Sequence, residues 1–244
     1  MDDRVAALDW DGIGAALDAN GCATTGTLLT EAECAALTAG YADDARFRSR
    51  IVMARHGFGR GEYRYYAYPL PEPIQALRAA LYGRLVGLAN RWQVALGRAA
   101  RFPARHADYL AQCHAAGQDR PTPLLLRYGP GDYNCLHQDL YGELHFPVQV
   151  AFLLSRPGQQ DVPDGSCSGA EFSGGEFVLT EQRPRMQSRA EVVPLRQGEG
   201  VIFAVNQRPV QGARGIYRVT MRHGVSRVRS GRRHTLGVIF HDTR

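Results

Sequence analysis

His137 and Asp139, separated by one residue, are two side chains that can bind the same metal ion. In extended backbone, residues i and i+2 project from one face, so both can reach one ion. His223 lies 86 residues further on, within an alternating apolar pattern over 217–221 that indicates another strand. Two histidines and one carboxylate on one face of an octahedral iron(II) ion leave three positions open for reacting molecules. We therefore predict an open iron(II) site made of His137, Asp139 and His223.

A cationic side chain follows this set at a distance that suits a second role. Arg233 lies ten residues after His223, beyond a turn expected at residues 230–231, so the returning strand should direct it into the same cavity. Its guanidinium can clamp a carboxylate through two hydrogen bonds, and Thr235, on the same strand face, can add a hydroxyl donor. A dicarboxylic keto acid is the expected ligand. Arg232 is the alternative clamp, and Arg233 would then be an ordinary surface residue.

Other residues that can bind metals are interpreted as structural. Cys113 and His114 have no second pair at zinc-site spacing, so we expect them to pack within a helix. Cys135 lies two residues before His137, and we expect it to be a buried thiol. The alternative metal ligands that remain are His145, His234 and His241.

The elements that must position these residues change in character near Pro121. From there on, short apolar runs alternate with Gly, Pro, Asn and Asp, which is typical of an antiparallel sandwich or barrel. The predicted strands cover 123–128, 145–154, 175–180, 190–195, 200–204, 216–225 and 233–240. The intervening segments 156–174 and 205–215 are predicted to be long loops.

The first 120 residues are predicted to be rich in helices. Helices are expected over 9–20 and over 30–42, with a short strand over 24–29 between them. Apolar residues spaced by three and four from Ile74 to Leu96, behind Pro71 and Pro73, predict a long core helix. No composition shift divides the chain, so we predict one domain, 1–244, with a supporting region and substrate lid in 1–120 and a catalytic core in 121–244.

Composition and charge restrict the class of protein. A mean hydropathy of −0.30 with 44% apolar residues is typical of a folded globular chain, and no apolar run is long enough to span a membrane. Five scattered cysteines favour free thiols, so we expect a cytoplasmic protein. All 29 basic residues are arginines, nine of them after residue 207, and the pI of about 9.1 favours a polyanionic partner. A biased coding composition explains the arginines equally well, and no oligomeric state is predicted.

Several motifs between 124 and 242 together resemble the 2-oxoglutarate and iron(II)-dependent dioxygenase superfamily. The stretch 127–139, with the sequence RYGPGDYNCLHQD, is similar to a motif of AlkB-type nucleic-acid demethylases. The segments GGEF at 174–177, GVIF at 200–203 and HGV at 223–225 resemble elements shared with the prolyl-hydroxylase-like branch. The resemblance implies an α+β fold with a mainly β core: a double-stranded β-helix, or jelly roll, with N-terminal supporting helices. An AlkB-like bacterial branch that acts on nucleic acid has this general layout.

The resemblance also implies roles and cofactors. Fe(II), 2-oxoglutarate and O2 would be required, Arg233 would bind the distal carboxylate of 2-oxoglutarate, and Tyr128 would donate to the same molecule. The implied activity is oxidative demethylation of damaged or single-stranded nucleic acid. Two residues depart from the demethylase pattern: Leu126 stands where Asn is usual, and Tyr141 stands where an acidic, base-reading residue is usual. The ten-residue interval between His223 and Arg233 is closer to that of prolyl hydroxylases.

The substrate is therefore open to alternatives. A protein or peptide hydroxylase is the second enzyme hypothesis, and a non-catalytic binding module on the same fold is the third. Tyr141, Arg64 and Tyr66 are candidate substrate contacts. The last two belong to a segment, 60–68, in which arginines alternate with aromatic residues. This segment is either a lid that stacks on bases and contacts phosphates, or a half-buried strand.

Overall fold

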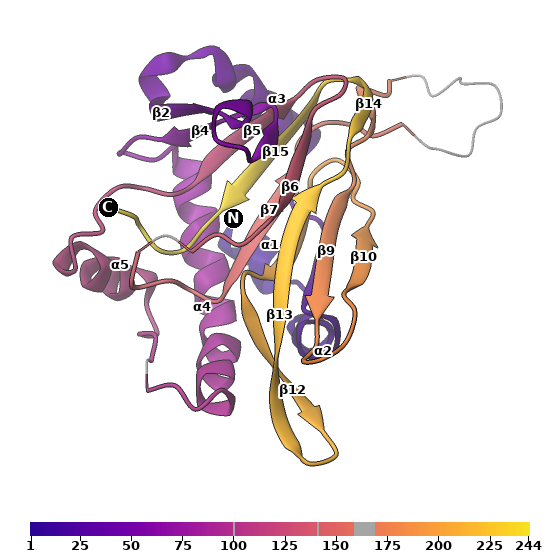
Figure 1. The fold of residues 1–244 in the computed structure, drawn as a ribbon. Helices are drawn as coiled ribbons and strands as arrows, with labels where there is room; N and C mark the ends of the chain where they lie inside the picture. Colours follow the sequence, from indigo (N-terminus) through magenta and orange to yellow (C-terminus); the bar gives the residue numbers. More distant parts are fainter. Residues whose placement is uncertain (100, 141, 159–168) are drawn as a thin grey trace.

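The computed structural model covers residues 1–244 and describes all of them except 100, 141 and 159–168. Within the described residues, two antiparallel sheets face each other, and helices from the first half of the chain cover the larger sheet (Figure 1). The larger sheet has seven strands, in the order β1 (Cys22–Thr27), β11 (Glu199–Ala204), β7 (Val148–Leu153), β15 (Arg233–Val238), β5 (Leu124–Tyr128), β4 (Glu62–Tyr66) and β2 (Phe47–Val52).

The second sheet forms the other layer of the sandwich. Its strands run in the order β10 (Arg189–Val193), β9 (Phe177–Gln182), β13 (Gly215–Val225), β6 (Tyr133–His137) and β3 (Gly59–Arg60), with β12 (Gln207–Gly212) also paired to β13. A short ribbon of β14 (Val228–Gly231) and β8 (Phe172–Gly174) lies beside them. The predicted antiparallel sandwich over residues 121–244 is thus confirmed.

The helices predicted over 9–20, 30–42 and 74–96 from capping residues and apolar spacing are present, together with two that these patterns did not predict. They are α1 (Asp2–Ala6), α2 (Trp10–Asn20), α3 (Glu31–Ala39), α4 (Glu72–Ala95) and α5 (His106–Ala115). Thr30 and Glu33 form the expected capping box at the start of α3. The apolar side of α4 enters the same core as Phe152 of β7 and Leu236 of β15. The helices therefore form a support that fixes the larger sheet.

One predicted connection differs from the structure. Residues 205–215 were predicted to be a loop, but they contain β12, which forms a hairpin with the first half of β13. The polar residues Gln207, Arg208 and Gln211 concealed this strand, because its side chains do not alternate between apolar and polar. The first 120 residues also contribute three strands to the large sheet: β1 was predicted over 24–29, β4 was one of the two interpretations of 60–68, and β2 was not predicted. The predicted single domain stays a prediction.

The chain reversal before β15 depends on one glycine. Gly231 has a φ of +74°, and a Cβ at this position would lie 1.9 Å from the backbone oxygen of Glu171. Only glycine tolerates both the positive φ and this close approach. The reversal directs Arg233, the first residue of β15, back toward the space between the sheets.

A buried ion pair attaches α4 to the end of the chain. Arg78 and Asp242 are fully buried and lie 2.7 Å apart, and Arg78 also donates to the backbone oxygens of Ile239 and His241. Removing one partner leaves an uncompensated buried charge, so Arg78→Met is expected to lower the free energy of unfolding by about 3–5 kcal/mol. Urea unfolding measures this.

An exposed ion pair between α4 and α2 is the matched control. Arg91 lies 2.9 Å from Asp18, and both side chains are largely in water. Arg91→Met is therefore expected to change the free energy of unfolding by no more than about 1 kcal/mol. Equal losses in the two variants would contradict the assigned role of the buried pair.

Among the described residues, none of the helices is long and apolar enough to cross a membrane.

Candidate metal and cosubstrate site

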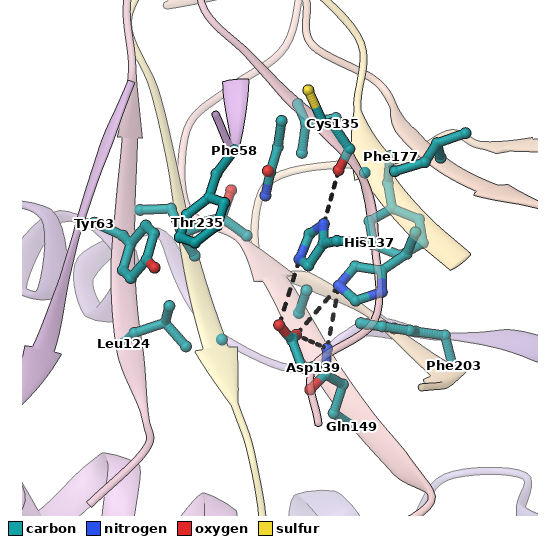
Figure 2. Close-up of a pocket in the computed structure, with 18 of the residues that line it drawn as sticks. Phe58, Tyr63, Leu124, Cys135, His137, Asp139, Gln149, Phe177, Phe203 and Thr235 are labelled. Atoms are coloured by element: carbon teal, nitrogen blue, oxygen red, sulfur yellow. Dashed lines mark hydrogen bonds and ion pairs between the residues drawn. The ribbon is translucent and has the colours of Figure 1, made fainter. Parts of the chain in front are cut away.

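Three ligand-capable side chains converge between the two sheets. His137 ends β6 and lies directly opposite His223 of β13 in the strand register, while Asp139 follows β6 in a segment without regular structure. Asp139 Oδ1 lies 3.4 Å from His137 Nε2, and Asp139 Oδ2 lies 3.3 Å from His223 Nε2. One ligand atom from each residue can be chosen so that all three lie within 4.8 Å of one another (Figure 2). The three predicted ligands therefore share one site.

The ring orientations suit metal binding through Nε2. His137 Nδ1 lies 2.8 Å from the backbone oxygen of Cys135, a group that can only accept, so Nδ1 carries the proton. A lone pair then remains on Nε2, which faces Asp139. Such a hydrogen bond, donated by the ring nitrogen that does not bind the metal, is how proteins fix the tautomer of a metal-binding histidine.

The charges of the three groups depend on one another. Burial alone would raise the pKa of Asp139, but hydrogen bonds and charge from His137 and His223 outweigh it and hold this pKa well below its ordinary value. Burial lowers the pKa of His223, which Asp139 only partly offsets. Burial also acts to lower the pKa of His137, but Asp139 outweighs burial there and the pKa is raised. An ionised carboxylate and a neutral His223 are the forms that bind a cation.

A cavity of about 380 Å³ opens beside these residues, and Arg233, Thr235 and Tyr128 line it together with apolar side chains. Arg233 is 2% exposed and donates to Thr235 Oγ1 at 2.5 Å. Burial lowers the pKa of Arg233 to about 10, so the guanidinium remains charged near neutral pH. The cavity thus has a cation on its wall as well as the triad.

Arg233 differs from the other fully buried arginines in lacking an acidic partner. Arg78 pairs with Asp242 and Arg208 pairs with Glu181, whereas no carboxylate in the described part of the chain lies within 4.0 Å of Arg233. Its Nε has no hydrogen-bond partner among the described residues. A buried charge without a counter-ion is unfavourable unless a ligand supplies one.

Tyr128 adds a second donor to the same wall. Its hydroxyl is buried, and the Arg233 guanidinium carbon lies 5.5 Å from the centre of its ring. Burial raises the pKa of Tyr128, so the phenol keeps its proton and can donate it. A carboxylate that enters the cavity can therefore meet donors from Arg233, Thr235 and Tyr128. The donor set fits iron(II) at one place in the cavity and a dicarboxylate at another.

The structure also separates the alternatives left by the sequence. Arg232 is exposed, whereas Arg233 lines the cavity. His145, His234 and His241 do not belong to the group of possible metal ligands found among the described residues, which consists of His137, Asp139 and His223. Cys135 was expected to be buried but is exposed, at the edge of the cavity.

The suggested substrate contacts are not brought to the cavity. Residues 62–66 form β4, the half-buried strand of the two interpretations, rather than a lid. Arg64 pairs with Asp44 and lies over the ring of Tyr41, and Tyr66 is 2% exposed, with its ring 4.8 Å from that of Phe47. Neither lines the cavity. Tyr141 lies outside the described residues.

Three cavity residues escaped the sequence analysis as site residues. Tyr63 belongs to the segment 60–68 but was not predicted to be a substrate contact. Phe58 could not be predicted, because no sequence pattern indicates that β3 pairs with β6. Gln149 interrupts the apolar run of β7, and a polar residue in a buried strand could have indicated a site residue. Figure 2 shows Phe58 projecting between Tyr63 and His137, and Gln149 beside Asp139.

The sequence comparisons identify relatives. Residues 61–243 match the family model Oxygenase-NA, described as an oxygenase catalysing oxidative methylation of damaged DNA. Two uncharacterised proteins of Mycobacterium tuberculosis, from strains CDC 1551 and H37Rv, are each 48% identical over 174 residues. The match covers 71% of this chain and 70% of each of theirs.

The solved structures that resemble this one share its fold at low identity. A Pseudomonas putida prolyl-4-hydroxylase has a TM-score of 0.52 at 15% identity, covering 96% of this chain and 99% of its own. A 2OG-Fe(II) oxygenase family oxidoreductase from Burkholderia pseudomallei has 0.51 at 17%, covering 96% and 92%. A Trichoplax adhaerens prolyl hydroxylase in complex with a hypoxia inducible factor peptide has 0.55 at 14%, covering 98% and 90%. The predicted jelly-roll fold is confirmed.

Proposed function

The chain belongs to the Oxygenase-NA family of the 2-oxoglutarate- and iron(II)-dependent oxygenases, and from this premise we propose that it oxidatively demethylates alkylated nucleic acid. The main support for a nucleic-acid substrate is the family match, which spans the metal triad and Arg233. The enzyme is a dioxygenase that uses Fe(II), 2-oxoglutarate and O2.

Each residue of the site has one task in this proposal. His137, Asp139 and His223 would hold the iron, and Arg233, with Thr235 and Tyr128, would bind the far carboxylate of 2-oxoglutarate. When bound, iron and 2-oxoglutarate supply the oxidising power from O2, with succinate and carbon dioxide as coproducts. A hydroxylated N-methyl group then releases formaldehyde and leaves the repaired amine.

The surface beside the cavity supports a nucleic-acid substrate. Phe58, at the cavity wall, is 47% exposed, although its backbone is fixed by hydrogen bonds with Met53 and Cys135. A rigid, exposed aromatic ring beside the reactive centre suits stacking with a planar base. Arg60, two residues after Phe58 and at the end of β3, is also exposed.

Further exposed cations lie around the turn at 129–132 that leads into β6. The backbone of Val228 bonds to Gly131 and Asp132 of this turn, which places β14 beside it. Arg227, Arg229 and Arg232 flank or belong to β14, and none forms an ion pair within the described ranges. Unpaired arginines beside a reactive site suit a phosphate backbone.

A peptide hydroxylase is the second candidate. The ten-residue interval between His223 and Arg233 supports it, as does the fold shared with prolyl hydroxylases. A non-catalytic binding module has no comparable support, since all three metal-binding side chains and the buried Arg233 are present.

Formaldehyde release from methylated single-stranded oligonucleotides tests the proposal. The protein with Fe(II), 2-oxoglutarate and O2 is expected to release about one formaldehyde per methyl group removed, with succinate formed in step. Unmethylated oligonucleotide is the matched control and should release none. A proline-containing peptide that gains one oxygen atom, with no formaldehyde from any methylated strand, would instead favour the peptide hydroxylase.

A further inference from the structure

Gln149 contacts two members of the metal triad from inside the rigid sheet. It lies on β7, between β11 and β15, and is 5% exposed. Its Nε2 lies 2.6 Å from Asp139 Oδ2 and 3.3 Å from His223 Nε2. Figure 2 shows its carboxamide directed at both groups. Gln149 therefore links β7 directly to two of the three predicted metal ligands.

The chemistry of a carboxamide restricts what these contacts can mean. An amide nitrogen only donates, so the atoms that it contacts must both accept. Asp139 Oδ2 accepts as a carboxylate oxygen, and His223 Nε2 accepts only when its lone pair is free. These are the forms in which both residues can bind a metal.

Asp139 needs such a partner because its own backbone is not held in a strand. Residues 138–140 have no regular structure, whereas Gln149 pairs with Phe203 of β11, and the next residue, Val150, pairs with strands on both sides. The hydrogen bond with Gln149 occupies Oδ2 and leaves Oδ1 directed at His137 Nε2. A carboxylate held in this way presents one oxygen to an ion rather than two.

We propose that Gln149 is a positioning residue that holds Asp139 as a one-oxygen metal ligand. An ion bound at His223 Nε2 would take the lone pair that faces Gln149, so the hydrogen bond to Asp139 is the one that persists. The inference rests on the proposed iron site. One oxygen from Asp139 and one nitrogen from each histidine keep three coordination positions open, whereas a two-oxygen Asp139 would fill one of them. Gln149 thereby preserves the positions that 2-oxoglutarate and O2 require.

The test is metal binding by Gln149→Met and Gln149→Leu, two variants of similar volume that lack the N–H donor. Isothermal titration calorimetry with Co(II) alone is expected to show an affinity about 10- to 100-fold below wild type, the usual effect of removing an outer hydrogen-bond partner of a ligand. The visible spectrum of bound Co(II) should also change, because the number of coordinated oxygens changes. Two variants are used so that one that fails to fold leaves the other.

Gln93→Leu is the matched control. Gln93 is 4% exposed on α4 and does not line the cavity, so its replacement removes a buried amide without touching the triad. It should leave both the Co(II) affinity and the spectrum unchanged, whatever its effect on the melting temperature.

The outcomes separate the inference from the proposed site. Wild-type affinity and an unchanged spectrum in folded Gln149 variants would overturn the role of Gln149, provided that His137→Ala still abolishes binding. If wild type binds no Co(II), or if His137→Ala binds as well as wild type, the proposed metal site itself is wrong. A lower melting temperature with unaltered Co(II) binding would show that Gln149 serves only the stability of the fold.

Discussion

Asp139→Ala is expected to abolish turnover and to weaken Fe(II) affinity more than about 100-fold, beyond the effect of losing an outer hydrogen-bond partner. Asp139 supplies the only carboxylate of the triad, and its pKa lies well below the ordinary value, so it is ionised near neutral pH. Two histidines alone offer neither a compensating negative charge nor the facial three-ligand geometry. Anaerobic calorimetry measures the affinity, and succinate formation measures turnover.

Asp108→Ala is the control for this variant. Asp108 is an exposed aspartate on α5 that pairs with Arg105, so its loss should change neither quantity. Circular dichroism checks that both variants fold. If folded Asp139→Ala keeps wild-type iron affinity, Asp139 is not a ligand and the assigned site is wrong.

Arg233→Met is expected to raise the KM for 2-oxoglutarate about 30- to 4,000-fold, the equivalent of the 2–5 kcal/mol that a buried charge pair loses when one member is truncated. Metal affinity should stay near wild type, because Arg233 is not among the ligands. The melting temperature of the metal-free protein should be unchanged or higher, because the variant removes a buried charge that has no acidic partner among the described residues. Initial rates against 2-oxoglutarate concentration measure the change.

The neighbouring arginine provides a matched control for this prediction. Arg232→Met removes the adjacent but exposed guanidinium and should leave the KM for 2-oxoglutarate unchanged. Arg233→Lys keeps the charge but loses the two-pronged hydrogen bonding, so it should give an intermediate KM. A KM that rises in Arg232→Met and not in Arg233→Met would transfer the clamp to Arg232.

The sequence predicted the centre of the site because short-range geometry determines it. His137 and Asp139 lie two residues apart, at and just after the end of a strand, and His223 lies in a strand whose alternation can be read from its apolar residues. The turn before Arg233 contains a glycine that its conformation requires, so the return of the chain was predictable as well. Only the choice between Arg232 and Arg233 needed the structure, because a shift of one residue reverses the face.

The rest of the site depends on contacts between distant strands. β4 is an interior strand of the large sheet, so Arg64 and Tyr66 are buried although their alternation with other polar and aromatic residues suggested an exposed lid. The pairing of β3 with β6 brings Phe58 to the cavity, and no local pattern encodes that pairing. Gln149 reaches the triad only because β7 lies opposite β13 across the sandwich.

Anaerobic visible absorption with Fe(II) and 2-oxoglutarate tests the site most directly, because only iron and cosubstrate bound together in one site produce a charge-transfer band. Wild-type protein is expected to give a weak visible band that saturates at one equivalent of iron. The band should be lost in His137→Ala, and in Arg233→Met it should appear only at much higher 2-oxoglutarate concentrations. A folded wild-type protein that gives no band, or a band that His137→Ala leaves unaltered, would contradict the assigned iron and 2-oxoglutarate site.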